Sequence, residues 1–189
     1  VVNASVKYPG KHNIENALAA SAVAKLAQIP EEKIKEALES YSGVKRRFET
    51  IYQDDKIVYI DDYAHHPKEL NATIGAVKEM YSDKKLTGIF QPHLFTRTRD
   101  FADDFAKSLE ELDVIILMEI YPAREEAIAG INSKFLLDKI DKKEKYLMSS
   151  NEIFNYLNDN TPECLLSLGA GNIDKLVEPI KAILSEKSY

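Results

Sequence analysis

From residue 48 onward, short apolar runs alternate with stretches in which apolar residues recur every three or four positions. The runs predict strands, and the recurring positions predict helices that pack on a sheet. The predicted strands are residues 48–52, 56–60, 86–91, 113–118, 146–148 and 164–168. The first two form a hairpin around Asp54 and Asp55, and helices separate the others. This order predicts an α/β fold: a mainly parallel sheet with helices on both faces and an antiparallel hairpin at its start.

The helices of this region are placed by their apolar stripes. The first begins at Pro67, and the stripe of the second lies between residues 101 and 112. Further helices are predicted near residues 133–140, at 151–157 and from residue 172 onward. Because proline removes a backbone donor, we expect Pro179 to bend or break the last helix.

The first 44 residues carry helix patterns only. Residues 12–28 are rich in alanine, and a second helix is predicted from Glu31, after Pro30, to about Gly43. Two helices without a sheet are too small for a domain and are typical of the end of one. We therefore predict two parts, residues 1–44 and 45–189.

Composition excludes several classes of protein. The chain has 44% hydrophobic and 30% charged residues, as in globular proteins, and its net charge of -6 disfavours a broad nucleic-acid or membrane surface. The sequence shows neither a membrane-spanning run nor a signal peptide, so we expect a cytoplasmic protein. Cys164 lies in an apolar run and is given no chemistry. The start at Val1, without methionine, fits a processed end, an omitted start or a segment of a longer protein.

Four polar clusters follow four of the predicted strands. Ligands of open parallel sheets bind beyond the carboxyl ends of the strands, so these clusters are expected at one edge. They are residues 61–66, residues 92–99, residues 119–122 and residues 169–172. Each cluster alone is also compatible with helix caps, tight turns or solvated charges. Arg97 and Arg99, however, are predicted in the first turn of a helix, where they oppose the helix dipole and favour an anion site.

Other polar groups leave alternatives open. Asp61, Asp62, His65, His66 and His93 could form a dinuclear metal site, although neighbouring histidines before a proline usually point apart. We therefore expect no metal site among these residues.

Two further groups suit a nucleotide. Asn13 and Asn16 share a helix face and could meet one flat ring, or could be ordinary helix-start residues. The basic triplet at residues 45–47 is either a solvated linker or a phosphate clamp.

Six motifs together resemble the Mur ligase family. They occur in the family's order and span nearly the whole chain: PGKHNIENALAA, GVKRRFE, DDYAHHP, FQPHLFTRTRDF, YPAREEAI and LGAGNID. The resemblance implies that residues 1–44 end a central ATP-binding domain and that residues 45–189 form a Rossmann-like C-terminal domain. It also implies a ligase of peptidoglycan precursor synthesis that uses ATP and magnesium. The motifs fit best the members that join L-alanine to UDP-N-acetylmuramate through an acyl phosphate.

The resemblance assigns nucleotide roles. His12, Asn13 and Asn16 match the adenine-contacting positions. Arg47 matches the arginine that meets the phosphate and ribose region of ATP, and Asp62 matches its acidic partner; both are implied in catalysis.

The resemblance also implies a pocket for L-alanine. Tyr63, His65 and Arg97 match its lining, with Arg97 as the partner of the alanine carboxylate. Many relatives carry a further arginine where this chain has Leu94, so Arg99 is a candidate replacement.

The sequence has no G-x-x-x-x-G-K-[ST] phosphate loop and no UDP-binding domain. We therefore expect a fragment that is inactive alone, with magnesium held mainly by the missing part of the central domain. The alternatives are a sister ligase that attaches a recycled peptide to UDP-N-acetylmuramate, a non-catalytic nucleotide-binding module and a metal hydrolase. We expect neither nucleic-acid binding nor membrane insertion.

Overall fold

The computed structural model describes residues 3–6, 11–41 and 43–187. The chain divides into two compact units, residues 1–45 and residues 46–189.

The first unit is built on two helices, α1 (Lys11–Leu26) and α2 (Glu31–Ser40). α1 ends two residues before its predicted end because Gln28 adopts a left-handed backbone with φ of 60°. α2 begins after Pro30, with Glu31 and Glu32 in its first turn, where acidic side chains favour the helix dipole. Large apolar side chains of α1 remain open to solvent: Leu18 is 64% exposed and Leu26 is 85% exposed.

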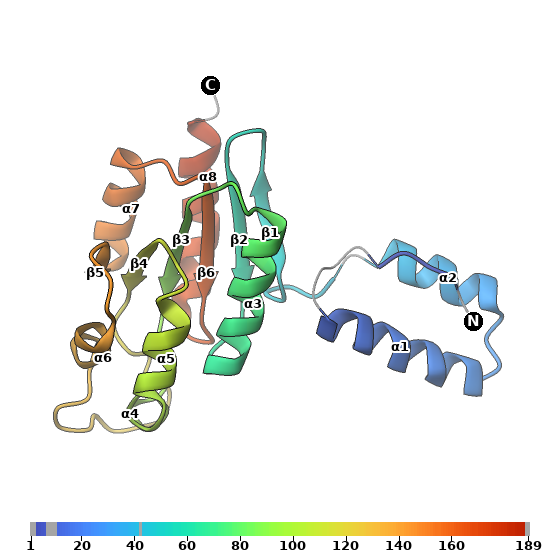
Figure 1. Cartoon of the computed structure of the whole chain (residues 1–189), viewed down its shortest axis with the longest axis horizontal. Helices are drawn as coiled ribbons and strands as arrows, with labels where there is room; N and C mark the ends of the chain where they lie inside the picture. The colour runs from blue at the N-terminus through green and yellow to red at the C-terminus, as the bar shows by residue number, and fades with distance from the viewer. Residues whose placement is uncertain (1–2, 7–10, 42, 188–189) are drawn as a thin grey trace. The chain divides into compact units, whose positions relative to one another are not determined.

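The second unit contains one sheet of six strands, ordered β1-β2-β6-β3-β4-β5 (Figure 1). The strands are β1 (Glu49–Gln53), β2 (Val58–Asp62), β3 (Leu86–Phe90), β4 (Val114–Leu117), β5 (Lys145–Leu147) and β6 (Cys164–Leu168). β1 pairs antiparallel with β2, and all other neighbours are parallel. The predicted α/β fold class, with its antiparallel hairpin and mainly parallel sheet, is confirmed.

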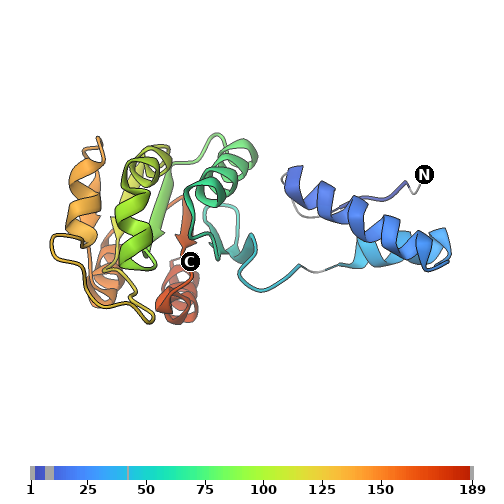
Figure 2. The same ribbon diagram turned by 90° about the horizontal axis from the view of Figure 1, so that it is seen from below.

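Helices cover both faces of the sheet, as the two views show (Figures 1 and 2). The helices are α3 (Pro67–Met80), α4 (Phe95–Asp100), α5 (Ala102–Leu109), α6 (Ser133–Lys139), α7 (Ser150–Asp159), the 3-10 helix η1 (Asn172–Leu176) and α8 (Val177–Glu186). α3, α5 and α6 bury apolar residues against one face, while α7, η1 and α8 bury theirs against the other.

The strands supply both cores by the two-residue alternation of their side chains. In β6, Cys164, Leu166 and Leu168 join the core under α3 and α5, whereas Leu165 joins the core under α7 and α8. Strands that are buried on both faces need continuous apolar runs, and such runs are what the sequence shows. Burial raises the pKa of the Cys164 thiol to about 12, so this cysteine remains a protonated core residue.

The helix predicted around residues 101–112 is instead two helices. α4 ends at Asp100, and α5 begins at Ala102 after Phe101, whose φ of -117° interrupts the helical backbone. α4 has only six residues, so Arg97, its third residue, lies in both its first and its last turn, whereas Arg99 lies in the last turn alone. The prediction that Arg99 lies in a first turn and opposes the helix dipole is wrong, because a basic residue near the carboxyl-terminal end is favourable. For Arg97, in the middle of so short a helix, the dipole gives no clear preference.

The last helix also differs from the prediction. Pro179 is the third residue of α8, where the backbone N–H would have no helical acceptor, so it neither bends nor breaks the helix. The change from 3-10 to α-helical geometry occurs earlier, between Leu176 and Val177.

The order of the strands fixes the position of a crevice. β2 and β3 lead into α3 and α4, whereas β6, which lies between these strands, leads into η1 and α8 on the opposite face. Ligands of open α/β sheets bind at such a switch point, beyond the carboxyl ends of the strands. Among the described helices, none combines the length and apolar character that crossing a bilayer requires.

A chain that begins at Val44 and ends at Tyr189 should fold by itself, because the second unit contains both hydrophobic cores. We expect a single cooperative thermal transition, measured by circular dichroism. A peptide of residues 1–45 should show no such transition, since its described large apolar side chains are mostly exposed. A gradual melt of residues 44–189 would contradict the two-unit division.

Candidate functional site

A tight turn at residues 46–48 leads into the sheet of the second unit. Arg46 and Phe48 both have left-handed φ values, 59° and 50°, which are uncommon for residues with a side chain. The Arg46 carbonyl accepts a hydrogen bond from the Tyr63 amide at 2.7 Å, and the Arg46 amide donates to Glu49 Oε2 at 2.8 Å. These contacts hold the turn against the carboxyl end of β2 despite its strain.

The Arg46 side chain crosses from β2 to β6. Its Nε lies 3.0 Å from Asp61 Oδ2, and its Nη2 donates to the Gly169 carbonyl at 2.5 Å. Asp61 is fully buried and also accepts a hydrogen bond from Ser167, which contacts the Tyr59 hydroxyl. Burial raises the pKa of Asp61, although the Ser167 hydrogen bond and the Arg46 charge act in the opposite direction.

Asp62 fastens the same turn through the backbone. Its two carboxylate oxygens accept hydrogen bonds from the amides of Phe48 at 2.7 Å and Ala64 at 2.8 Å. Burial raises the pKa of Asp62 as well, against the effect of these two hydrogen bonds and of the Arg47 charge.

The ion pair expected between Arg47 and Asp62 is not found in the described chain, where the carboxylate contacts Phe48 and Ala64 instead. The ion pair joins the preceding residues, Arg46 and Asp61. The left-handed residues on either side of Arg47 turn the Arg46 side chain toward the sheet and leave Arg47 exposed. The Arg47 guanidinium stacks over the Tyr63 ring at 5.4 Å, where it remains accessible to a ligand.

A row of four rings lines the carboxyl edge of the sheet. Tyr63 meets His65 edge-on at 5.2 Å, His65 meets His93 at 6.0 Å, and His93 stacks on Tyr121 at 5.6 Å. These residues follow β2, β3 and β4, so the sheet order brings together positions far apart in the sequence. His66 points elsewhere: it caps α3 and packs on Phe101.

Arg97 lies beside this row. It is half-buried, and its Nη1 lies 3.5 Å from His93 Nδ1. Among the residues that the structure describes, Arg97 has no carboxylate within ion-pair distance. Arg99 differs, because it is exposed and pairs with Asp100 at 2.7 Å. The structure thus brings Tyr63, His65 and Arg97 together and directs Arg99 to its neighbour.

The loop after β4 closes the other side of the site. Glu125 accepts hydrogen bonds from the amide of Thr96 at 2.9 Å and from its hydroxyl, and these contacts hold the loop on the start of α4. Leu94 has a left-handed φ of 73°, and its amide donates to the Tyr121 carbonyl at 2.9 Å. The backbone conformation of Leu94 is therefore held by this hydrogen bond.

The glycine loop after β6 allows close packing at the edge. A Cβ at Gly171 would lie 2.4 Å from Gln91 Oε1 and 2.6 Å from Tyr121 Cβ. Gln91 can therefore accept from the Ile173 amide at 2.9 Å and donate to Asn172 Oδ1 at 2.7 Å. Glycine is needed here because any side chain would separate these strands' ends.

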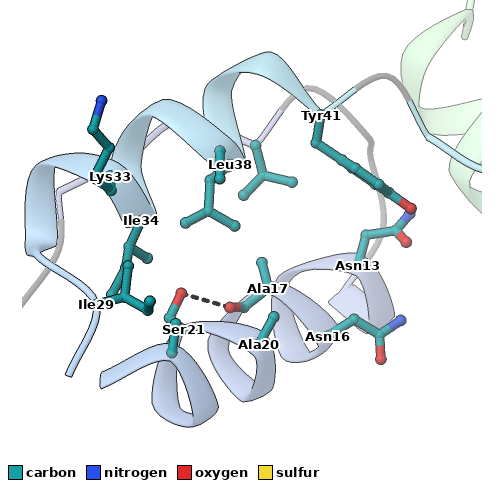
Figure 3. A pocket seen from close by; sticks show the side chains of 13 residues that line it. Asn13, Asn16, Ala17, Ala20, Ser21, Ile29, Lys33, Ile34, Leu38 and Tyr41 are labelled. Atoms are coloured by element: carbon teal, nitrogen blue, oxygen red, sulfur yellow. Dashed lines mark hydrogen bonds between the residues drawn. The ribbon is translucent and has the colours of Figure 1, made fainter. Parts of the chain in front are cut away.

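The predicted adenine residues belong to the first unit. Asn13 and Asn16 lie near each other on α1, and Tyr41 of the segment after α2 extends toward Asn13 (Figure 3). They border a cavity of about 460 Å³ whose remaining lining is mainly alanine, isoleucine and leucine. His12 is in α1, but its side chain lies outside the described part of the structure. Two amides beside an apolar groove suit a flat heterocycle.

The described residues contain no group of three acidic, histidine or cysteine side chains placed to hold a metal ion. His65 and His93 approach each other, but Asp61 and Asp62 are occupied by Arg46 and by backbone amides.

Sequence reasoning missed three residues of the site. The sequence shows Arg46 only as part of a basic triplet, Asp61 only as a possible metal ligand, and Glu125 only as part of a family motif. An acid at the end of an apolar strand is a signal for Asp61, since a buried carboxylate needs a partner. The Arg46 and Glu125 contacts depend on loop conformations that no local sequence pattern predicts.

Comparison with known proteins gives one family. A model of the Mur ligase glutamate ligase domain matches residues 46–166. A UDP-N-acetylmuramate--L-alanine ligase of Flavobacterium psychrophilum is 52% identical over 179 residues, which are 95% of this chain and 40% of that protein. A protein of the same name from Parabacteroides distasonis is 50% identical, over 95% of this chain and 39% of its own length. The chain thus spans about 40% of the length of these relatives.

Solved structures agree with this fold. The UDP-N-acetylmuramate-alanine ligase MurC of Thermotoga maritima has a TM-score of 0.80 at 29% identity, covering 98% of this chain and 40% of that one. A murein peptide ligase of Psychrobacter arcticus has a TM-score of 0.66 at 23% identity, covering 96% of this chain and 38% of that one. The second likeness concerns the fold alone.

Replacing Arg46 by alanine should destabilise the chain, because Asp61 would lose its cation while remaining buried. Leaving a buried group unpaired costs about 1 to 3 kcal/mol. Arg46 favours the ionised carboxylate, so without it the pKa of Asp61 rises further. The loss should therefore be largest near neutral pH and shrink as the pH falls through the raised pKa and Asp61 takes up a proton.

Urea unfolding of Arg46→Ala and of the unchanged chain, at about pH 7 and about pH 4, measures this difference. Lys45→Ala is the control, because this neighbouring side chain is exposed. An equal loss for Arg46→Ala at both pH values would refute the assigned charge pairing.

Proposed function

We propose that this chain, which belongs to the Mur ligase family, is the C-terminal part of an ATP-dependent ligase that joins L-alanine to UDP-N-acetylmuramate. The match to the Mur ligase domain and the names of the relatives at about 50% identity support this proposal. The relatives are about two and a half times as long, so the activity belongs to the longer protein. Such a ligase acts in peptidoglycan precursor synthesis, and we place it in the cytoplasm.

The carboxyl edge of the sheet is the proposed pocket for L-alanine. An amino acid presents a carboxylate and an amino group a few ångströms apart, and only the amino group reacts in amide formation. Arg97 would hold the carboxylate, because a guanidinium fork matches two carboxylate oxygens. Tyr63 and His65 would form the wall beside the substrate. This arrangement fixes one end of alanine and leaves its amino group directed toward the acyl phosphate.

The observation that carries this proposal is the state of Arg97. It is half-buried beside a row of rings and, within the described residues, is not neutralised by a carboxylate. A partly desolvated guanidinium without an anionic partner is well suited to bind an anion. Arg99, which is exposed and pairs with Asp100, is less suited to replace the missing arginine at Leu94.

Each unit carries candidate nucleotide contacts of its own. Asn13 and Asn16, with His12 beside them, would contact adenine, and exposed Arg47 would meet the phosphate and ribose region. Asp62 would act on Arg47 indirectly, by fastening the turn that presents it. ATP supplies the phosphoryl group that activates the carboxylate of UDP-N-acetylmuramate. Magnesium would be held mainly by the rest of the central domain.

The first unit is proposed to be the end of that central ATP-binding domain. Its helix α1 exposes Leu18, Val23 and Leu26 by 64%, 66% and 85%. Apolar side chains at this density on one helix are typical of an interface rather than of a free surface. The additional length of the relatives provides chain that would cover them.

In the full-length ligase, Arg97→Ala should raise the KM for L-alanine and leave the KM for ATP nearly unchanged. A hydrogen bond to a charged group contributes roughly 1.5 to 3 kcal/mol, so kcat/KM for alanine should fall by about 10- to 100-fold. Arg97→Lys should recover only part of this loss, because lysine keeps the charge without the planar fork.

Two matched variants accompany this measurement. Lys107→Ala removes an exposed cation of α5 and should change neither KM. Arg99→Ala removes the other arginine of α4, and it should have a much smaller effect than Arg97→Ala. Alanine kinetics that are unchanged in Arg97→Ala would end the assignment of the pocket.

The 189-residue chain alone should release no phosphate from ATP, with or without UDP-N-acetylmuramate, L-alanine and magnesium. The reason is that it lacks a phosphate-loop sequence to hold the transferred group. A colorimetric phosphate assay measures this, with the full-length ligase as the positive control. Magnesium-dependent turnover by the purified chain would contradict the proposal that phosphoryl transfer needs the rest of the longer protein.

A further inference from the structure

Arg97 is held by a histidine rather than by an acid. Its Nη1 lies 3.5 Å from Nδ1 of His93, four residues earlier in the chain. A guanidinium carries donors only, so the contact requires that Nδ1 accept and therefore carry no proton. His93 beside Arg97 is then neutral, with its single ring proton on Nε2.

The surroundings of His93 favour this neutral form. Burial lowers the pKa of His93, and the Arg97 and His65 charges lower it further, while Glu125 acts weakly in the opposite direction. Glu125 does not replace His93 as the partner of Arg97, because its oxygens contact Thr96.

The His93 ring is also fixed in place. It stacks on Tyr121 at 5.6 Å with an interplanar angle of 24°, and it meets the edge of His65 at 6.0 Å. Its backbone forms a parallel bridge to Tyr121, which ties the end of β3 to the loop after β4. Because these contacts restrict the His93 ring, its hydrogen bond can restrict the Arg97 guanidinium.

The choice of a neutral partner has a consequence for charge. A carboxylate at the position of His93 would orient Arg97 but would neutralise it and compete with an incoming anion. A neutral imidazole orients the guanidinium through one N–H and leaves its charge and its remaining donors for the ligand. Arg46 shows the contrast: it is paired with Asp61 and has a structural role.

We infer that His93 is a positioning residue of the amino-acid pocket. It holds Arg97 in place for the alanine carboxylate and, because it is neutral, leaves the positive charge of Arg97 available to the substrate. This inference rests on the proposed function of Arg97. It assigns His93 no contact with the reacting atoms and no proton transfer.

The test uses two variants of the full-length ligase. His93→Phe keeps a ring to stack on Tyr121 but removes the acceptor, so it should raise the KM for L-alanine by about tenfold. His93→Asn places an acceptor oxygen near the position of Nδ1 and should restore a substantial part of the loss. The KM for ATP and the melting temperature of His93→Phe should stay close to those of the unchanged enzyme. Equal defects in both variants, or no change in alanine KM, would overturn the inference.

A double-mutant cycle separates this inference from the proposed function. If His93 acts through Arg97, then adding His93→Phe to Arg97→Ala should cause little further loss. Additive losses would show that His93 acts independently and would refute the positioning role. If Arg97→Ala alone leaves alanine kinetics unchanged, the pocket assignment itself fails; if it raises the KM but His93→Phe does not, only the inference fails.

Nitrogen NMR of the 189-residue chain provides a readout that does not need activity. At neutral pH, the His93 ring should show an unprotonated Nδ1 and a protonated Nε2, with the signal identified by its loss in His93→Phe. A protonated Nδ1 would contradict the contact with Arg97.

Discussion

Two neighbouring carboxylates, Asp61 and Asp62, stand at the buried end of β2, and the free-energy cost of burying them organises the chain around them. Asp61 is compensated by Arg46 and Ser167, and Asp62 by two backbone amides. One contact in each set, the Arg46 guanidinium for Asp61 and the Phe48 amide for Asp62, comes from the strained turn at residues 46–48. The same turn directs Arg47 outward and places the Tyr63 ring under the guanidinium groups of Arg46 and Arg47. Buried acids at a strand end therefore shape the exposed surface beside them.

The site uses arginine in two distinct ways. Arg46 is bound to a buried carboxylate and a carbonyl, so its charge stabilises the fold and is not available to a ligand. Arg97 is held by an imidazole and has no acid within ion-pair distance in the described chain, so its charge remains available. The difference between them is the partner, and it agrees with the proposed binding of a carboxylate at Arg97.

Sequence reasoning predicted the fold well because doubly buried strands need continuous apolar runs, as in β2, β4 and β6. It was less successful where tertiary contacts decide the backbone. The break at Phe101 separates α4 from α5 and reverses the dipole argument for Arg99, and no glycine or proline marks it. The ion pair at Arg46 rather than Arg47 depends on left-handed residues that are not glycine. The convergence of Tyr63, His65 and Arg97 at one edge could be predicted, because the carboxyl ends of parallel strands share an edge of the sheet.

The most direct test of the central claim is a crystal structure of the full-length ligase with L-alanine, UDP-N-acetylmuramate and a non-hydrolysable ATP analogue. We expect the alanine carboxylate within hydrogen-bond distance of the Arg97 guanidinium, and Arg97 still in contact with His93. The alanine amino group should face away from Arg97, toward the muramoyl carboxylate. Alanine bound away from the carboxyl ends of β2 and β3, or a carboxylate held by Arg99 instead, would contradict the central claim.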